Sequence, residues 1–127
     1  MQITFIIPCY NASKIINKNN KKLIKFIKNA KIKEKIIYIN DGSEDNTLKK
    51  LKKIKSKNIQ IFNNKYNLGK SKSISNVLKT VKAKNIVLID CDLPYFGYLK
   101  TTIKYLRKYD LVTINRKLKN SKNLDKS

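Results

Sequence analysis

The chain has 127 residues, 41% of them apolar, which is enough for one domain with its own core, and no apolar run approaches the roughly 18 residues of a membrane-spanning helix. It contains no histidine, which excludes catalysis by a Ser-His or Cys-His pair and zinc held by histidine, and its two cysteines are too few for a disulfide framework. The formal charge is +22 and all but two of the 30 basic residues are lysine, so this is a basic protein whose field attracts nucleic acid, anionic lipid head groups and phosphorylated ligands.

Short apolar runs rich in isoleucine and valine predict strands at residues 3–7, 36–39, 59–62, 86–89 and 111–114. The segments between them carry apolar residues at helical spacing, as in the stripe Ile74, Val77, Leu78 and Val81. Strands that alternate with helices favour right-handed crossovers. The sequence therefore predicts an α/β fold: an open, mostly parallel, Rossmann-like sheet of about five strands, with about four helices on its two faces.

Polar residues before the helical segments predict where the helices begin. Ser13 is expected to cap the first helix, and Ser43 the second, with Glu44 and Asp45 in its first turn. Gly69 is expected to precede the third helix, whose opening residues could then meet a phosphate or the edge of a ligand.

Two aspartates follow the fourth predicted strand directly. In Asp90-Cys91-Asp92 an extended backbone points residues 90 and 92 to the same side, so their carboxylates can converge on one hard cation or one polar ligand. A run that is apolar at every position is typical of a strand buried on both faces, and the carboxyl ends of such parallel strands are where α/β sheets bind ligands. Asp90 and Asp92 are therefore the candidate catalytic and metal-binding residues.

Three further segments also follow predicted strands, and with the DXD motif at Asp90 they form a pattern. The segments Ile6–Asn11, Asn40–Thr47, Asn67–Lys70 and Asp90–Leu93, taken in this order and spacing, resemble the nucleotide-binding half of a family 2 glycosyltransferase with the GT-A fold. Each segment alone is a weak signal, but all four occur in register over about 90 residues.

The resemblance implies roles for individual residues. It implies that the nucleotide of a GDP- or UDP-sugar donor is held by Pro8, Tyr10, Asn11, Asp41, Gly69 and Lys70. It implies that Asp90 and Asp92 hold Mg²⁺ or Mn²⁺, the second aspartate usually being the direct ligand. A divalent cation that bridges both phosphates stabilises the charge that develops on the departing diphosphate.

Within that family the likeness is greatest to the dolichyl-phosphate or polyprenyl-phosphate mannosyltransferase type, because Tyr109–Arg116 looks like the segment that follows the metal motif there. The resemblance implies an inverting, metal-dependent transfer of sugar to a polyprenyl phosphate, with Arg116 contacting the acceptor phosphate. A phosphate acceptor is already an anion at neutral pH and needs cationic positioning rather than a general base. We expect a cytoplasmic protein, peripheral at the membrane surface.

The sequence also departs from the family pattern. Ala12 and Asn40 stand where acidic residues are usual, and the family's domain normally continues well past Arg116. We expect a GT-A-like domain over residues 1–116 without the acceptor half, followed by a polar, loosely ordered tail over residues 117–127. The alternative is a catalytically inactive binding module that docks on anionic membrane or nucleic acid through its basic surface; no specific nucleic acid is expected, since no nucleic-acid motif occurs.

Overall fold

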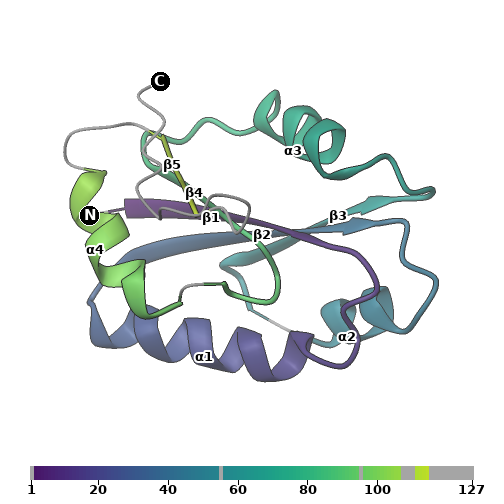
Figure 1. Cartoon of the computed structure of the whole chain (residues 1–127), viewed down its shortest axis with the longest axis horizontal. Helices are drawn as coiled ribbons and strands as arrows, with labels where there is room; N and C mark the ends of the chain where they lie inside the picture. The colour runs from purple at the N-terminus through teal and green to yellow at the C-terminus, as the bar shows by residue number, and fades with distance from the viewer. Residues whose placement is uncertain (1, 55, 95, 107–110, 115–127) are drawn as a thin grey trace.

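In the computed structural model, strands and helices alternate along the chain (Figure 1). The residues it describes are 2–54, 56–94, 96–106 and 111–114. The elements are β1 (Gln2–Cys9), α1 (Ile16–Asn29), β2 (Lys33–Asp41), α2 (Thr47–Lys53), β3 (Ile59–Asn64), α3 (Lys70–Leu78), β4 (Ile86–Ile89), the 3₁₀ turn η1 (Phe96–Tyr98), α4 (Leu99–Tyr105) and β5 (Leu111–Ile114).

The strands form one five-stranded sheet in the order β3-β2-β1-β4-β5, and every pair is parallel. The strand order reverses between β1 and β4, because the chain first builds outward from β1 through β2 to β3 and then returns to the other side of β1. Ligands of open α/β sheets bind at such a switch point, outside the carboxyl ends of the strands. The predicted fold class is confirmed.

Helices cover both faces of the sheet, but unequally. Figure 1 shows α1, α2 and α4 on one face and α3 on the other. Alternate residues of β1 divide between the two faces: Phe5 packs in the core beneath α1, and Ile6 in the smaller core beneath α3. The larger core includes Leu23 of α1 and Leu51 of α2, both fully buried. The apolar residues that occur at helical spacing in the sequence are thus the ones that face the sheet.

The predicted helix caps are wrong for the first two helices. The residues at the N-caps are Ile15 and Asn46, neither of which makes a side-chain cap hydrogen bond, and Glu44 and Asp45 lie before α2 rather than in its first turn. The third prediction is confirmed, because Gly69 is the N-cap of α3. The helix α3 ends at Leu78, earlier than the stripe that reaches Val81 suggests.

Three strands also extend beyond the carboxyl ends of their apolar runs. β1 continues through Pro8 to Cys9, β2 through Asn40 to Asp41, and β3 to Asn64, because these strands stay paired to their ends. The predicted ligand-binding residues Pro8 and Asp41 are therefore held on the rigid sheet and not in loops.

The predicted tail, residues 117–127, lies outside the described residues, as does Arg116. Among the helices that the structure describes, none has the length and apolar character needed to cross a bilayer.

Candidate functional site

A cavity of about 510 Å³ opens at the carboxyl edge of the sheet, around the ends of β1 and β4. Its wall contains every predicted site residue that the structure describes: Pro8, Tyr10, Asn11, Asp41, Gly69, Lys70, Asp90 and Asp92. These residues come from four segments separated by up to 84 positions, and the parallel sheet brings them together. Sequence reasoning did not single out as site residues the others on the wall, which are Cys9, Ala12, Ile15, Asn67 and Cys91.

Asp41 anchors the loop that precedes α3. Its side chain is buried, its Oδ1 accepts hydrogen bonds from the backbone N–H of Leu68 at 2.8 Å and from Nδ2 of Asn64 at 3.1 Å, and its Oδ2 accepts one from the N–H of Gly69 at 3.0 Å. Burial raises the pKa of Asp41, but these hydrogen bonds and one from Ser73 outweigh it, so the pKa lies below its ordinary value. The carboxylate is therefore charged and committed largely to holding residues 68 and 69 against the cavity.

Asp90 forms a salt bridge with Lys70, the first residue of α3. The side chain of Asp90 is 27% exposed and that of Lys70 is 54% exposed, so the pair sits at the mouth of the cavity. Asp92, two positions on, is exposed and also on the wall. Residues 90–93 form a turn: Leu93, directly after Asp92, has φ +51° and donates its N–H to the carbonyl of Asp90 at 2.9 Å.

Tyr10 and Asn11, which follow β1, are also part of the cavity wall. The side chain of Tyr10 is 50% exposed, which leaves its ring and hydroxyl open to a ligand. Asn11 has φ +50° and joins two loops: its N–H donates to Oγ of Ser43 at 2.9 Å, and its Oδ1 accepts from the N–H of Glu44 at 2.8 Å. Ser43 therefore positions this loop instead of capping α2.

The two departures from the family pattern have different surroundings. Ala12 lies on the cavity wall, and its N–H donates to Oγ1 of Thr47 at 2.8 Å. Asn40 is buried and not part of the wall; its Nδ2 donates to Oδ1 of Asn63 at 2.8 Å, and within the described part of the chain its Oδ1 has no partner. The missing charge at position 40 is therefore in the interior of the sheet, outside the cavity wall.

Asp45 ties the start of α2 to the start of α1. It accepts hydrogen bonds from the N–H and hydroxyl of Thr47 and from the N–H of Ser13. Desolvation raises the pKa of Asp45, but these hydrogen bonds lower it by more, to about 2. Because its folded-state pKa lies below the unfolded value, the stabilisation is present above about pH 4 and is lost as the pH falls toward about 2.

We therefore expect Asp45→Asn to flatten the loss of stability between pH 4 and pH 2. The measurement is urea unfolding at several pH values for the parent and the variant. Equal slopes in the two proteins would contradict the assignment.

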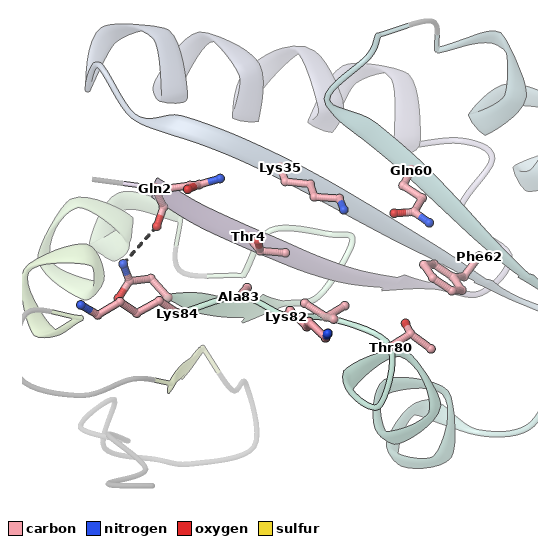
Figure 2. A pocket seen from close by; sticks show the side chains of 11 residues that line it. Gln2, Thr4, Lys35, Gln60, Phe62, Thr80, Lys82, Ala83 and Lys84 are labelled. Carbon is pink, nitrogen blue, oxygen red and sulfur yellow. Dashed lines mark hydrogen bonds between the residues drawn. The ribbon is translucent and has the colours of Figure 1, made fainter.

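A second cavity, of about 570 Å³, lies at the amino edge of the sheet, away from these residues (Figure 2). Lys35 of β2, Gln60 of β3 and Lys82 border it, and its wall contains no carboxylate. It is the larger of the two spaces, but without a carboxylate its wall offers no acidic ligand for a divalent cation. The carboxyl-edge cavity is therefore the candidate site.

The carboxylates at the carboxyl edge fit a cation that binds together with a second ligand. No group of three or more histidine, cysteine, aspartate or glutamate side chains that could hold a metal occurs in the described ranges. Mg²⁺ is usually held by one or two carboxylates and completes its shell with water and substrate phosphates. The pair Asp90 and Asp92 matches that requirement, whereas an all-protein metal cage would need more ligands.

Comparison with known proteins agrees with this geometry. Residues 4–127 match the family model described as Glycosyl transferase family 2. The chain belongs to this family of enzymes. The predicted family membership is confirmed.

Named relatives fall into more than one group of transferases. The chain is 32% identical over 131 residues to poly-beta-1,6-N-acetyl-D-glucosamine synthase of Staphylococcus aureus, covering 96% of this chain and 30% of the relative. It is 27% identical over 117 residues to a dolichyl-phosphate beta-glucosyltransferase of Trichomonas vaginalis, covering 84% and 36%. The second name agrees with the predicted likeness to transferases of the lipid-phosphate type. The chain thus spans about a third of the length of these relatives.

Solved structures show the same fold. A mannosyltransferase from Pyrobaculum calidifontis, in complex with GDP-Man and Mn²⁺, superposes with a TM-score of 0.67 at 19% identity, over 82% of this chain and 32% of that one. The TarS protein of Staphylococcus aureus, in complex with UDP-GlcNAc, gives 0.66 at 24% identity, over 86% and 32%. Both likenesses support the GT-A arrangement of the sheet.

Proposed function

We propose that this chain binds the nucleotide-diphospho-sugar donor of an inverting, metal-dependent glycosyltransferase. The observation that carries the proposal is the convergence of Asp90, Asp92 and Lys70 on one cavity with the Tyr10–Asn11 loop and Asp41. Carboxylates for a cation, an ammonium for a phosphate and an open aromatic ring for a base are the groups such a donor needs. The GDP-Man and UDP-GlcNAc bound in the two solved structures support a donor of this class.

The residues of the site have different roles in this proposal. Asp90 and Asp92 would hold Mg²⁺ or Mn²⁺, which when bound neutralises charge on the departing diphosphate. Lys70 adds a positive charge at the same mouth. Asp41 keeps the N–H groups of Leu68 and Gly69 turned inward, and so fixes the loop that would close over the nucleotide.

The acceptor class is part of the proposal. A polyprenyl phosphate is the acceptor class that we propose, because a phosphate acceptor is already an anion and needs no general base. The name of the Trichomonas relative supports this class. Arg116 would contact the acceptor phosphate, and the protein would then work peripherally at a membrane surface.

The test is thermal unfolding with UDP or GDP, each with and without Mn²⁺. A ligand at about 100 times its Kd adds about 2.7 kcal/mol to stability, so we expect the Tm to rise by several degrees with one of the two nucleotides plus Mn²⁺. Asp92→Asn is expected to abolish the part of this shift that depends on Mn²⁺.

Glu44→Gln is the matched control, because it removes the same charge from an exposed residue outside the cavity wall. It should leave the shift intact. A flat response to both nucleotides, together with binding to anionic vesicles that is indifferent to Asp92→Asn, would favour the alternative of an inactive module with a basic docking surface.

A further inference from the structure

The salt bridge between Lys70 and Asp90 joins two residues of the cavity wall that belong to different elements. Lys70 opens α3, and Asp90 directly follows β4. The backbone before Lys70 is held in place, because Asp41 accepts the N–H groups of Leu68 and Gly69. The side chain itself is 54% exposed, so its ammonium can swing while its Cα stays fixed.

The ammonium of Lys70 contacts an oxygen that a divalent cation would also need. Mg²⁺ and Mn²⁺ take carboxylate oxygens as ligands, and Asp90 is one of the two aspartates of the cavity wall that we propose as ligands, whereas both oxygens of Asp41 hold the loop before α3. A lysine ammonium is a compact point charge on a flexible stem of four carbons, which suits it to exchange between anionic partners. Lys70 and a divalent cation therefore compete for Asp90.

Entry of a nucleoside diphosphate would change this balance. Its phosphate oxygens offer Lys70 a second anionic partner at the same mouth of the cavity, and movement of Lys70 to them frees the carboxylate of Asp90. Binding of the diphosphate and binding of the cation then favour each other. The diphosphate draws Lys70 away from the carboxylate that the cation needs, and the cation replaces Lys70 at Asp90 and so frees it for the phosphates.

We propose that Lys70 is an exchangeable counter-ion, a positioning residue that neutralises Asp90 in the absence of donor and moves to the diphosphate when donor and cation bind. The movement of Lys70 to a diphosphate rests on the proposed function, whereas its neutralisation of Asp90 does not. The consequence is an order of binding: the cation binds weakly by itself and tightly together with the nucleotide.

The first measurement is Mn²⁺ binding without nucleotide, followed through the free-Mn²⁺ electron paramagnetic resonance signal at low, fixed ionic strength. Lys70→Gln is expected to bind Mn²⁺ about threefold to fivefold more tightly than the parent, as expected for loss of one partly exposed ion pair. Lys72→Gln is the matched control, because it removes the same charge from an exposed residue of the same helix outside the cavity wall. Lys70→Arg, which keeps the charge, should resemble the parent.

The second measurement is binding of UDP and GDP without metal, for the same variants. Lys70→Gln should bind the preferred nucleotide several-fold more weakly. The gain in nucleotide affinity on adding Mn²⁺ should be smaller than in the parent, because no lysine then has to leave Asp90. Lys72→Gln should change neither quantity.

The outcomes separate the two ideas. If no nucleotide binds to any variant, the proposed function fails, while the Mn²⁺ titration still decides whether Lys70 competes for Asp90. Equal Mn²⁺ affinities for Lys70→Gln and Lys72→Gln, or no Mn²⁺ binding by any variant, would overturn the counter-ion role.

Discussion

Replacing Gly42 with alanine is expected to lower the free energy of unfolding by about 3 kcal/mol. Gly42 has φ +65°, and a Cβ at this position would lie 2.3 Å from the backbone N of Asn67 and 2.3 Å from the backbone C of Tyr66. Both atoms belong to the backbone of the loop before α3, so a side-chain rotation cannot relieve the clash. The loop must move, and it is the loop that Asp41 holds against the cavity.

Two other glycines provide a graded control. Gly69 has φ +90° and ψ 153°, a backbone region essentially restricted to glycine, but open space around the missing Cβ, so Gly69→Ala should cost about 1 to 2 kcal/mol of backbone strain. Gly97 has neither feature, and Gly97→Ala should change stability by less than about 0.5 kcal/mol. Urea unfolding of the three variants checks the order. A loss at Gly42 no larger than that at Gly69 would show that the loop yields without cost.

The strands and helices could be predicted from the sequence because the apolar pattern records burial. Ile86–Ile89 is apolar at each position since the strand is covered on both faces, and Leu23 and Ile27 follow helical spacing because α1 packs on the sheet. The strand ends were predicted too short, because Asn40 and Asp41 are polar and yet remain paired with β1 or β3. Asn40 and Asp41 are polar because their side chains hydrogen-bond to residues of neighbouring segments, and the apolar pattern of the sequence does not encode such contacts.

The helix caps failed for a related reason. Ser43 and Asp45 are residues that favour caps, but their oxygens accept the N–H groups of Asn11 and Ser13, more than 30 positions earlier. Local propensity does not reveal such long-range partners, because they form only when two loops meet at the sheet edge.

The residues of the candidate site were predicted correctly as neighbours, but not their pairings. Parallel strands place their carboxyl ends at one edge, so Asp41 and Asp90 had to approach the same region. Which oxygen meets which donor depends on the path of residues 66–69, and that path is set by the contact with Gly42 and the positive φ of Gly69. Hence the ion pair of Lys70 with Asp90 was not foreseen from the sequence.

The largest effect at the site itself is expected from Asp41→Asn, which should destabilise the fold by about 2 to 3 kcal/mol and weaken nucleotide binding as well. An amide in place of the carboxylate turns an NH₂ group toward at least one of the three N–H donors that Asp41 now accepts. One backbone N–H of Leu68 or Gly69 then loses its partner in a partly buried position, and the loop before α3 loses its anchor.

The pH dependence gives this prediction a second measurement. Because the folded-state pKa of Asp41 lies below its ordinary value, its contribution is present above the unfolded pKa, near 4, and disappears as the pH falls through the folded-state pKa. Urea unfolding should therefore show the parent and Asp41→Asn converging in stability as the solution becomes acidic, whereas Glu44→Gln, which removes the same charge from an exposed side chain, should follow the parent throughout. A difference between parent and Asp41→Asn that stays constant down to pH 2 would mean that the carboxylate charge does not hold the loop, and the loop's position over the cavity would then need the contact at Gly42 alone.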